Sequence, residues 1–116
     1  QYQDKIVHCE KPLSNRDGYY SASIDAFVKE RLDFMKLDIE GAEIQAVEGA
    51  ERTLRSNSVR CSVCCYHKKE DEAILKKKFA EFGYDTGVSK GYMTFLWDRD
   101  IWWNVGFRRG VVYAEK

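Results

Sequence analysis

Residues 34–43, FMKLDIEGAE, constrain the fold of this chain more than any other stretch. A short apolar run ends in Asp38, a second acid follows at Glu40, and Gly41 allows the chain to turn tightly into the next segment. In open α/β sheets, ligands bind beyond the carboxyl ends of the strands, which is where this acidic turn would lie. The stretch therefore predicts a strand-to-helix turn at the edge of an α/β sheet, with its acids placed to meet a ligand.

Helical and strand-like patterns alternate along the rest of the chain. The pattern predicts helices at residues 23–28, 42–55 and 70–82, and strands at residues 32–39, 59–66, 92–97 and 110–114. Such alternation implies right-handed crossovers and a parallel sheet, whereas the last two strands have no helix between them and should pair antiparallel. We therefore predict an α/β fold with a mainly parallel sheet, flanked by helices and carrying an antiparallel strand pair at the C-terminus.

Three residues mark the predicted helices. Ser23 is a plausible N-cap for the first, and Gly83 stands where the C-terminal cap of the last belongs. Gly49 lies inside the middle helix, where it costs roughly 1 kcal/mol relative to Ala, so a close packing contact is expected there.

Composition narrows the class of protein and its partners. The chain has 116 residues, enough for one domain, with 19 basic residues balancing 19 acidic ones. There is no overall charge that favours nucleic acid, and no apolar run approaches the ~20 residues of a membrane span. Of the four cysteines, three crowd one apolar run at Cys61, Cys64 and Cys65, which predicts buried, reduced thiols and a cytoplasmic location.

Four blocks of this sequence, taken together, resemble the FkbM-type methyltransferases. They are SIDAFV at 23–28, LDFMKLDIEGAE at 32–43, VEGA at 47–50 and YHK at 66–68. The resemblance implies a Rossmann-like, S-adenosylmethionine-dependent enzyme that methylates hydroxyl oxygens of sugars or other small metabolites. A small-molecule or glycan acceptor is then the expected partner.

One feature of that family is missing from this chain. Such enzymes carry a glycine-rich strand-to-helix turn that holds the cofactor, and none of the eight glycines here forms one. We therefore expect residues 1–116 to be the C-terminal part of a Rossmann-like methyltransferase domain without its N-terminal cofactor-binding half. No cofactor-binding residue is assigned, and the sheet edge left bare by the missing half is expected to allow a homodimer.

Asp38 and His67 are the predicted catalytic residues. Methyl transfer requires a nucleophilic oxygen held in line with the methyl group and a group that removes its proton. Asp38 ends the first strong strand, although it could instead cap the next helix. His67 follows the second strong strand, and an imidazole titrates near neutral pH, but it could also merely bond a backbone carbonyl at the strand end.

Glu40 and Glu43 are the predicted substrate-binding residues, on the turn that follows Asp38. Clustered carboxylates also suit a divalent cation, and acids at a helix start stabilise its positive end. The run from Cys61 to His67 contains C-x-x-C and a histidine, but alternating strand side chains make a poor zinc knuckle, so no metal site is predicted from it.

The C-terminal third is rich in aromatic residues. Phe95 and the tryptophans at 97, 102 and 103 form an aromatic group that borders an acceptor, closes the core, or covers surface left exposed by loss of the N-terminal half. The alternative to a methyltransferase is a non-catalytic α/β module, derived from the same fold, that serves in binding or assembly.

Overall fold

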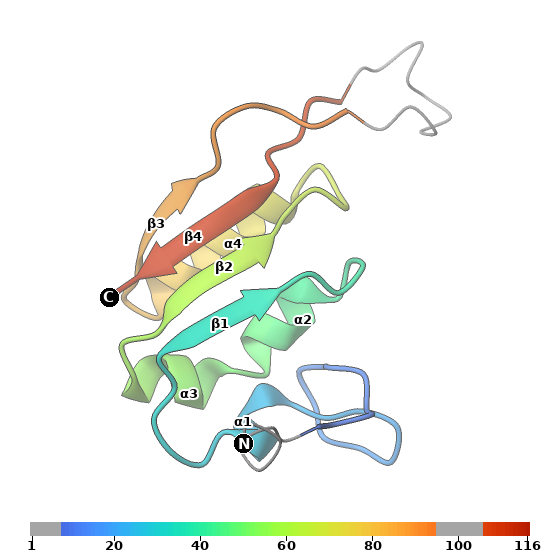
Figure 1. The fold of residues 1–116 in the computed structure, drawn as a ribbon, viewed down its shortest axis with the longest axis vertical. Coiled ribbons are helices and arrows are strands. Elements are labelled where there is room, and N and C mark those ends of the chain that lie inside the picture. The colour runs from blue at the N-terminus through green and yellow to red at the C-terminus, as the bar shows by residue number, and fades with distance from the viewer. Residues whose placement is uncertain (1–7, 95–105) are drawn as a thin grey trace, which may run out of the picture.

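A four-stranded mixed sheet with helices on one face makes up the protein (Figure 1). The computed structural model describes residues 8–94 and 106–116. Along the chain the elements are α1 Ile24–Phe27, β1 Phe34–Leu37, α2 Glu43–Glu48, α3 Glu51–Ser56, β2 Arg60–Cys64, α4 Asp71–Glu81, β3 Asp85–Val88 and β4 Val111–Glu115. The predicted α/β class is confirmed.

The strands lie side by side in the order β1-β2-β4-β3. β1 and β2 are parallel neighbours, and β4 pairs antiparallel with both β2 and β3. It follows that β1, β2 and β3 all point the same way and that only β4 is reversed, inserted between β2 and β3. An antiparallel pair near the C-terminus is present as predicted, but β4 pairs with β3 rather than with residues 92–97. The carboxyl ends of β1 and β2 meet at one edge of the sheet.

One face of this sheet is buried and the other is open. On β1, Met35 and Leu37 are buried while Phe34 is 55% exposed, as expected when alternate side chains face opposite sides. The helices α2, α3 and α4 cover the buried face (Figure 1). The core lies between them and the sheet, and its largest fully buried side chains include Leu54, Leu75 and Phe79.

Several predicted helix features are confirmed, and one is corrected. The Ser23 hydroxyl accepts a hydrogen bond from the Ala26 backbone N–H, and Gly83 has a left-handed φ of 80° after α4. The single helix predicted over residues 42–55 is instead two short helices, α2 and α3. The break falls at Gly49, where a Cβ atom would lie 2.2 Å from the backbone oxygen of Ser14, so the expected close contact is real.

The strands near the C-terminus differ from the prediction. β3 was not predicted, because Asp85 and Gly87 are poor strand formers, and its pairing with β4 supplies the stability that propensity lacks. Of the strand predicted over residues 92–97, Met93 forms an isolated bridge with Arg108, and residues 95–97 lie outside the described residues, as do the tryptophans at 102 and 103.

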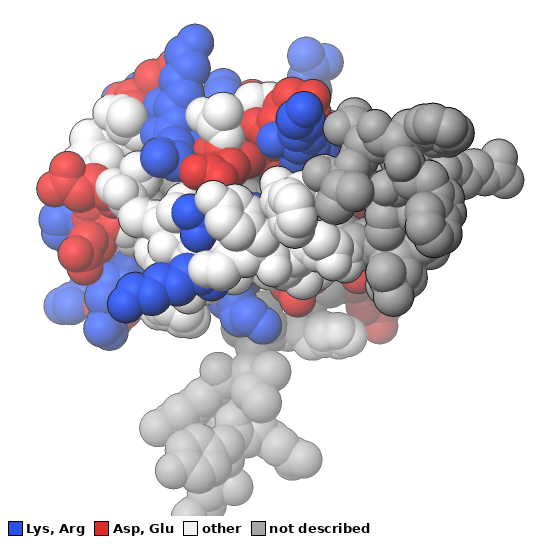
Figure 2. Space-filling model, turned by 90° about the horizontal axis from the view of Figure 1, so that it is seen from above, with Lys and Arg blue, Asp and Glu red and all other residues white. Residues whose placement is uncertain are grey.

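Two properties bear on the environment of the protein. Within residues 8–94 and 106–116, no helix combines the length and apolar character needed to cross a lipid bilayer. On the face that Figure 2 shows, acidic and basic side chains are interspersed among the described residues. Cys61, Cys64 and Cys65 are buried free thiols on and just after β2, in agreement with the predicted core packing.

Candidate active site

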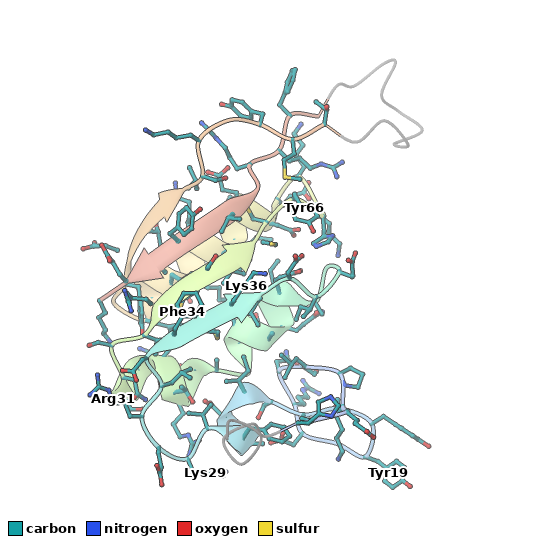
Figure 3. All side chains as sticks on the ribbon, viewed as in Figure 1. Tyr19, Lys29, Arg31, Phe34, Lys36 and Tyr66 are labelled. Carbon is teal, nitrogen blue, oxygen red and sulfur yellow. The ribbon has the colours of Figure 1, made fainter. Side chains whose placement is uncertain are left out.

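The carboxyl ends of β1 and β2 form the candidate site, which we call the acidic rim and define by Asp38, Glu43, Tyr66 and His67. Leu37 pairs with Val63 across the two parallel strands, so the residues that follow each strand emerge side by side. Figure 3 shows Tyr66 just beyond the end of β2, next to the end of β1. The two predicted catalytic residues therefore share one edge of the sheet.

A strained turn leads from β1 into α2. Glu40 has a positive φ of 57°, and Gly41 follows with a φ of 95°. Left-handed backbone is uncommon outside glycine and tends to occur at functional sites, where the surrounding structure holds it. Here the turn is held from inside by Glu43, whose Oε1 accepts a hydrogen bond from the Ile39 backbone N–H at 2.8 Å.

The same turn packs against the end of β2. A Cβ atom built on Gly41 would lie 3.7 Å from the Cβ of His67, an ordinary van der Waals distance. The backbone of the turn therefore lies directly beside the histidine.

Asp38 is exposed at the rim and forms a hydrogen-bonded pair with Tyr66. The Tyr66 hydroxyl donates to Oδ1 of Asp38 at 2.9 Å. This bond, together with one from the Cys64 thiol, lowers the pKa of Asp38, and the same interaction raises the pKa of Tyr66 to about 12. Asp38 is thus held as a carboxylate, ready to accept a further hydrogen bond, and Tyr66 as a neutral phenol.

Glu43 and His67 form a second pair, deeper in the rim. Nε2 of His67 lies 3.2 Å from Oε1 of Glu43, and the two side chains are 15% and 3% exposed. Glu43 is the N-terminal residue of α2, and its carboxylate is directed back toward the turn and the histidine. In this arrangement Glu43 can orient the imidazole, which keeps only a small opening to solvent.

Three side chains of the rim lie close enough to share a ligand. One potential ligand atom from each of Asp38, Glu43 and His67 falls within 4.8 Å of the other two. Glu40, the fourth predicted site residue, is exposed on the turn. The structure therefore brings Asp38, Glu43 and His67 together and leaves Glu40 at the outer surface, while the roles predicted for all four stay predictions.

Three contributors to the rim were not predicted from the sequence. Cys64 and Tyr66 both contact Asp38, and Nη1 of Arg108 donates to the backbone oxygens of Tyr66 and His67 at 3.2 Å each. Tyr66 stands beside His67 in the sequence, which is a usable signal. Arg108 is distant in sequence and reaches the rim only because β4 inserts next to β2.

A separate hollow of about 650 Å³ lies on the open face of the sheet. Its lining includes Phe34, Ser62, Gly87 and Tyr113 but no member of the acidic rim. Phe34 and Lys36 project from this face of β1 in Figure 3. Asp85, Glu115 and Arg60 also line the hollow, but among the described residues the converging acid and histidine atoms are those of the rim. The rim is therefore the better candidate for chemistry.

Comparisons with known proteins bear on the family and the fold of this chain. Residues 21–86, more than half of the chain, match the family model of the methyltransferase FkbM domain. No curated protein matches the sequence. The fold is similar to the crystal structure of methyltransferase FkbM from Methylobacillus flagellatus KT, with 23% identity and a TM-score of 0.59. That likeness covers 81% of this chain but only 22% of the other, and all four predicted site residues fall inside residues 21–86.

Proposed function

The chain belongs to the FkbM methyltransferase domain family, and from that premise we propose that it is part of an S-adenosylmethionine-dependent methyltransferase. The proposed reaction is O-methylation of a hydroxyl group on a sugar or another small metabolite. In this proposal the acidic rim receives the acceptor, and Asp38 and His67 act on its hydroxyl.

The observation that carries the proposal is the convergence of Asp38 and His67 at the carboxyl ends of two adjacent parallel strands. This is the edge of an α/β sheet at which ligands bind. Methyl transfer requires the acceptor oxygen to be oriented and its proton to be withdrawn, which calls for polar groups that face one point. Asp38 is exposed and held as a carboxylate, so it is suited to accept a hydrogen bond from an acceptor hydroxyl.

Each predicted residue has a role in this proposal. His67 is oriented by Glu43, so we assign Glu43 a positioning role in addition to the substrate contact that the sequence suggested. The exposed Glu40 is available for the outer part of an acceptor such as a sugar hydroxyl. Tyr66 keeps Asp38 ionised and in place.

S-adenosylmethionine supplies the methyl group in this family, and the described residues do not fit it by themselves. The one glycine-containing turn that directly links a described strand to a helix is the turn at Gly41, and acids of the rim fill it. We therefore propose that a further segment of the domain supplies the cofactor site, and we route no step through the cofactor. The free, buried thiols of β2 support a reducing, cytoplasmic setting.

The test is methyl transfer by a protein that contains this sequence together with the remainder of the domain. Radiolabelled S-adenosylmethionine is offered with a panel of sugars and hydroxylated metabolites, and transfer to an oxygen is the expected result. Asp38→Asn and His67→Gln should each lower kcat by about 100-fold or more. The 116-residue chain alone should show no saturable binding of micromolar S-adenosylmethionine in calorimetry.

The same assay separates the alternative of a non-catalytic binding or assembly module. That alternative predicts no transfer to any acceptor, with cofactor binding absent from the longer protein as well. Transfer that persists unchanged in both variants would leave the family assignment in place but remove the rim from the mechanism.

A further inference from the structure

We propose that Asp38, Glu43 and His67 bind one divalent cation at the acidic rim. The three residues come from three different places in the fold: the end of β1, the start of α2 and the end of β2. Their ligand atoms nevertheless lie within 4.8 Å of one another. Two carboxylates and an imidazole are a common donor set for a first-row divalent metal.

The state of His67 is an independent observation that points to a ligand. Its Nε2 atom is buried and has no hydrogen-bond partner among the described residues, although Glu43 lies 3.2 Å away. Buried polar atoms without a hydrogen bond are rare and costly in native proteins. A cation between the two side chains would give this nitrogen a partner and would hold the imidazole in one tautomer.

The charge at the rim has the same implication. Glu43 is only 2% exposed, and a carboxylate buried so deeply needs a nearby positive charge. A divalent ion would neutralise the two carboxylates of Asp38 and Glu43 together.

The geometry of the site favours Mn²⁺ or Zn²⁺ over Ca²⁺. Bonds of ~2.0–2.2 Å in a tetrahedral site place ligand atoms about 3.4 Å apart. The ligand atoms of Asp38, Glu43 and His67, now within 4.8 Å of one another, would therefore have to move closer together. Asp38 is exposed and would make that adjustment by rotating its side chain, which would lengthen or break its hydrogen bond with Tyr66. Ca²⁺ would need several more oxygen ligands. Water or an acceptor oxygen would complete the coordination.

Cation binding can be tested separately from the proposed function. Only the role of the ion in methyl transfer rests on that function. An ion at this position would bind the acceptor oxygen and make its hydroxyl more acidic. Binding itself needs neither cofactor nor acceptor. If methyl transfer fails while the chain binds metal, only the proposed function is rejected. If methyl transfer succeeds while the chain binds no metal, only the proposed cation site is rejected.

The experiment titrates the metal-free 116-residue chain with MnCl₂ and follows free Mn²⁺ by electron paramagnetic resonance. We expect one ion per chain, with an affinity that falls ~10–100-fold in Asp38→Asn and in His67→Gln. Asp33→Asn is the matched control, because Asp33 is an exposed acid just before β1, at the opposite end of the strand from Asp38. Its affinity should equal that of the native chain.

A second measurement does not depend on any variant folding. In the native chain, Mn²⁺ should broaden the imidazole resonances of His67 at ion concentrations that leave those of the exposed His8 sharp. Binding that is equally strong in Asp38→Asn and Asp33→Asn, or broadening of both histidines together, would overturn the proposal, as would the absence of binding at millimolar Mn²⁺.

Discussion

The two ends of the strands differ in how they satisfy their polar groups, and each end is organised around a tyrosine. At the amino ends of β2 and β3, the Tyr84 hydroxyl is buried, accepts from the Val59 N–H at 3.2 Å and lies within hydrogen-bond distance of the oxygens of Leu54 and Asn57. At the carboxyl ends of β1 and β2, Tyr66 bonds instead to the side chain of Asp38.

The difference separates an end whose tyrosine hydroxyl is satisfied by backbone groups from the end that we propose to be functional. Every partner of the Tyr84 hydroxyl is a backbone group, so this tyrosine closes the ends of neighbouring elements and contributes no reactive group. The rim has an exposed carboxylate and a buried imidazole nitrogen without a hydrogen bond, and the adjoining turn has Glu40 in left-handed backbone. Ligand sites are built from such incompletely satisfied groups, and they reduce stability where they occur.

Replacing the buried tyrosine gives the largest effect on stability that this comparison predicts. In Tyr84→Phe the ring still packs 5.8 Å from Phe79, but the Val59 N–H and the Asn57 oxygen lose their partner. We expect the free energy of unfolding to fall by about 1–3 kcal/mol. Urea denaturation measures the loss.

The matched control for that variant is Tyr66→Phe, which removes the same hydroxyl group at the other end of the sheet. Because Tyr66 and Asp38 form an accessible pair, the free energy of unfolding should change by less than about 0.5 kcal/mol. Equal losses in the two variants would mean that both ends are structural, and the comparison would fail.

The turn at Glu40 predicts a smaller change in the free energy of unfolding, and relieving its strain should stabilise the protein. Its φ of 57° is strained for a residue with a Cβ atom, so Glu40→Gly should raise the free energy of unfolding by about 0.5–1 kcal/mol. Glu40→Ala is the control, since it removes the same carboxylate but keeps the Cβ atom and the strain. If thermal unfolding shows Glu40→Gly to be no more stable than Glu40→Ala, the rim stores no strain at this residue.

The shared position of Asp38 and His67 at one edge of the sheet was predicted, because the signals for it are local. A short apolar run ending in Asp38, and a second one leading to His67, are visible in isolation, and alternation with helices makes the two strands parallel. The N-cap at Ser23, the cap at Gly83 and the close contact at Gly49 depend on one residue each, and all three were predicted.

The sequence predicted poorly whatever depends on pairing between distant segments. β3 forms because β4 lies beside it, and neither Asp85 nor Gly87 indicates a strand by itself. Arg108 reaches the rim through the insertion of β4, which no local pattern reveals. The buried position of Glu43 was also unpredictable, because an acid at the start of a helix is usually exposed and stabilises the helix from outside.

The smallest predicted effect concerns the pKa values of the Asp38–Tyr66 pair, and it shows whether the pair exists in solution. The hydrogen bond from Tyr66 is the main cause that lowers the pKa of Asp38 below 3.8, and it raises the pKa of Tyr66 from 10.0 to about 12. In Tyr66→Phe the pKa of Asp38 should therefore rise toward 3.8, as measured by nuclear magnetic resonance of the carboxyl carbon. In Asp38→Asn the pKa of Tyr66 should fall toward 10.0, as measured by the ultraviolet absorbance of phenolate.

The direction of the linked stability follows from these two shifts. The carboxyl pKa is depressed by folding, so its contribution is present above pH 3.8 and is lost as pH falls through the native pKa. The phenol pKa is raised, so its contribution is present below pH 10.0 and is lost as pH rises toward about 12. If the two variants left the pKa of the remaining partner unchanged, Asp38 would be an isolated surface acid, and the rim would lose the group that we expect to hold the acceptor.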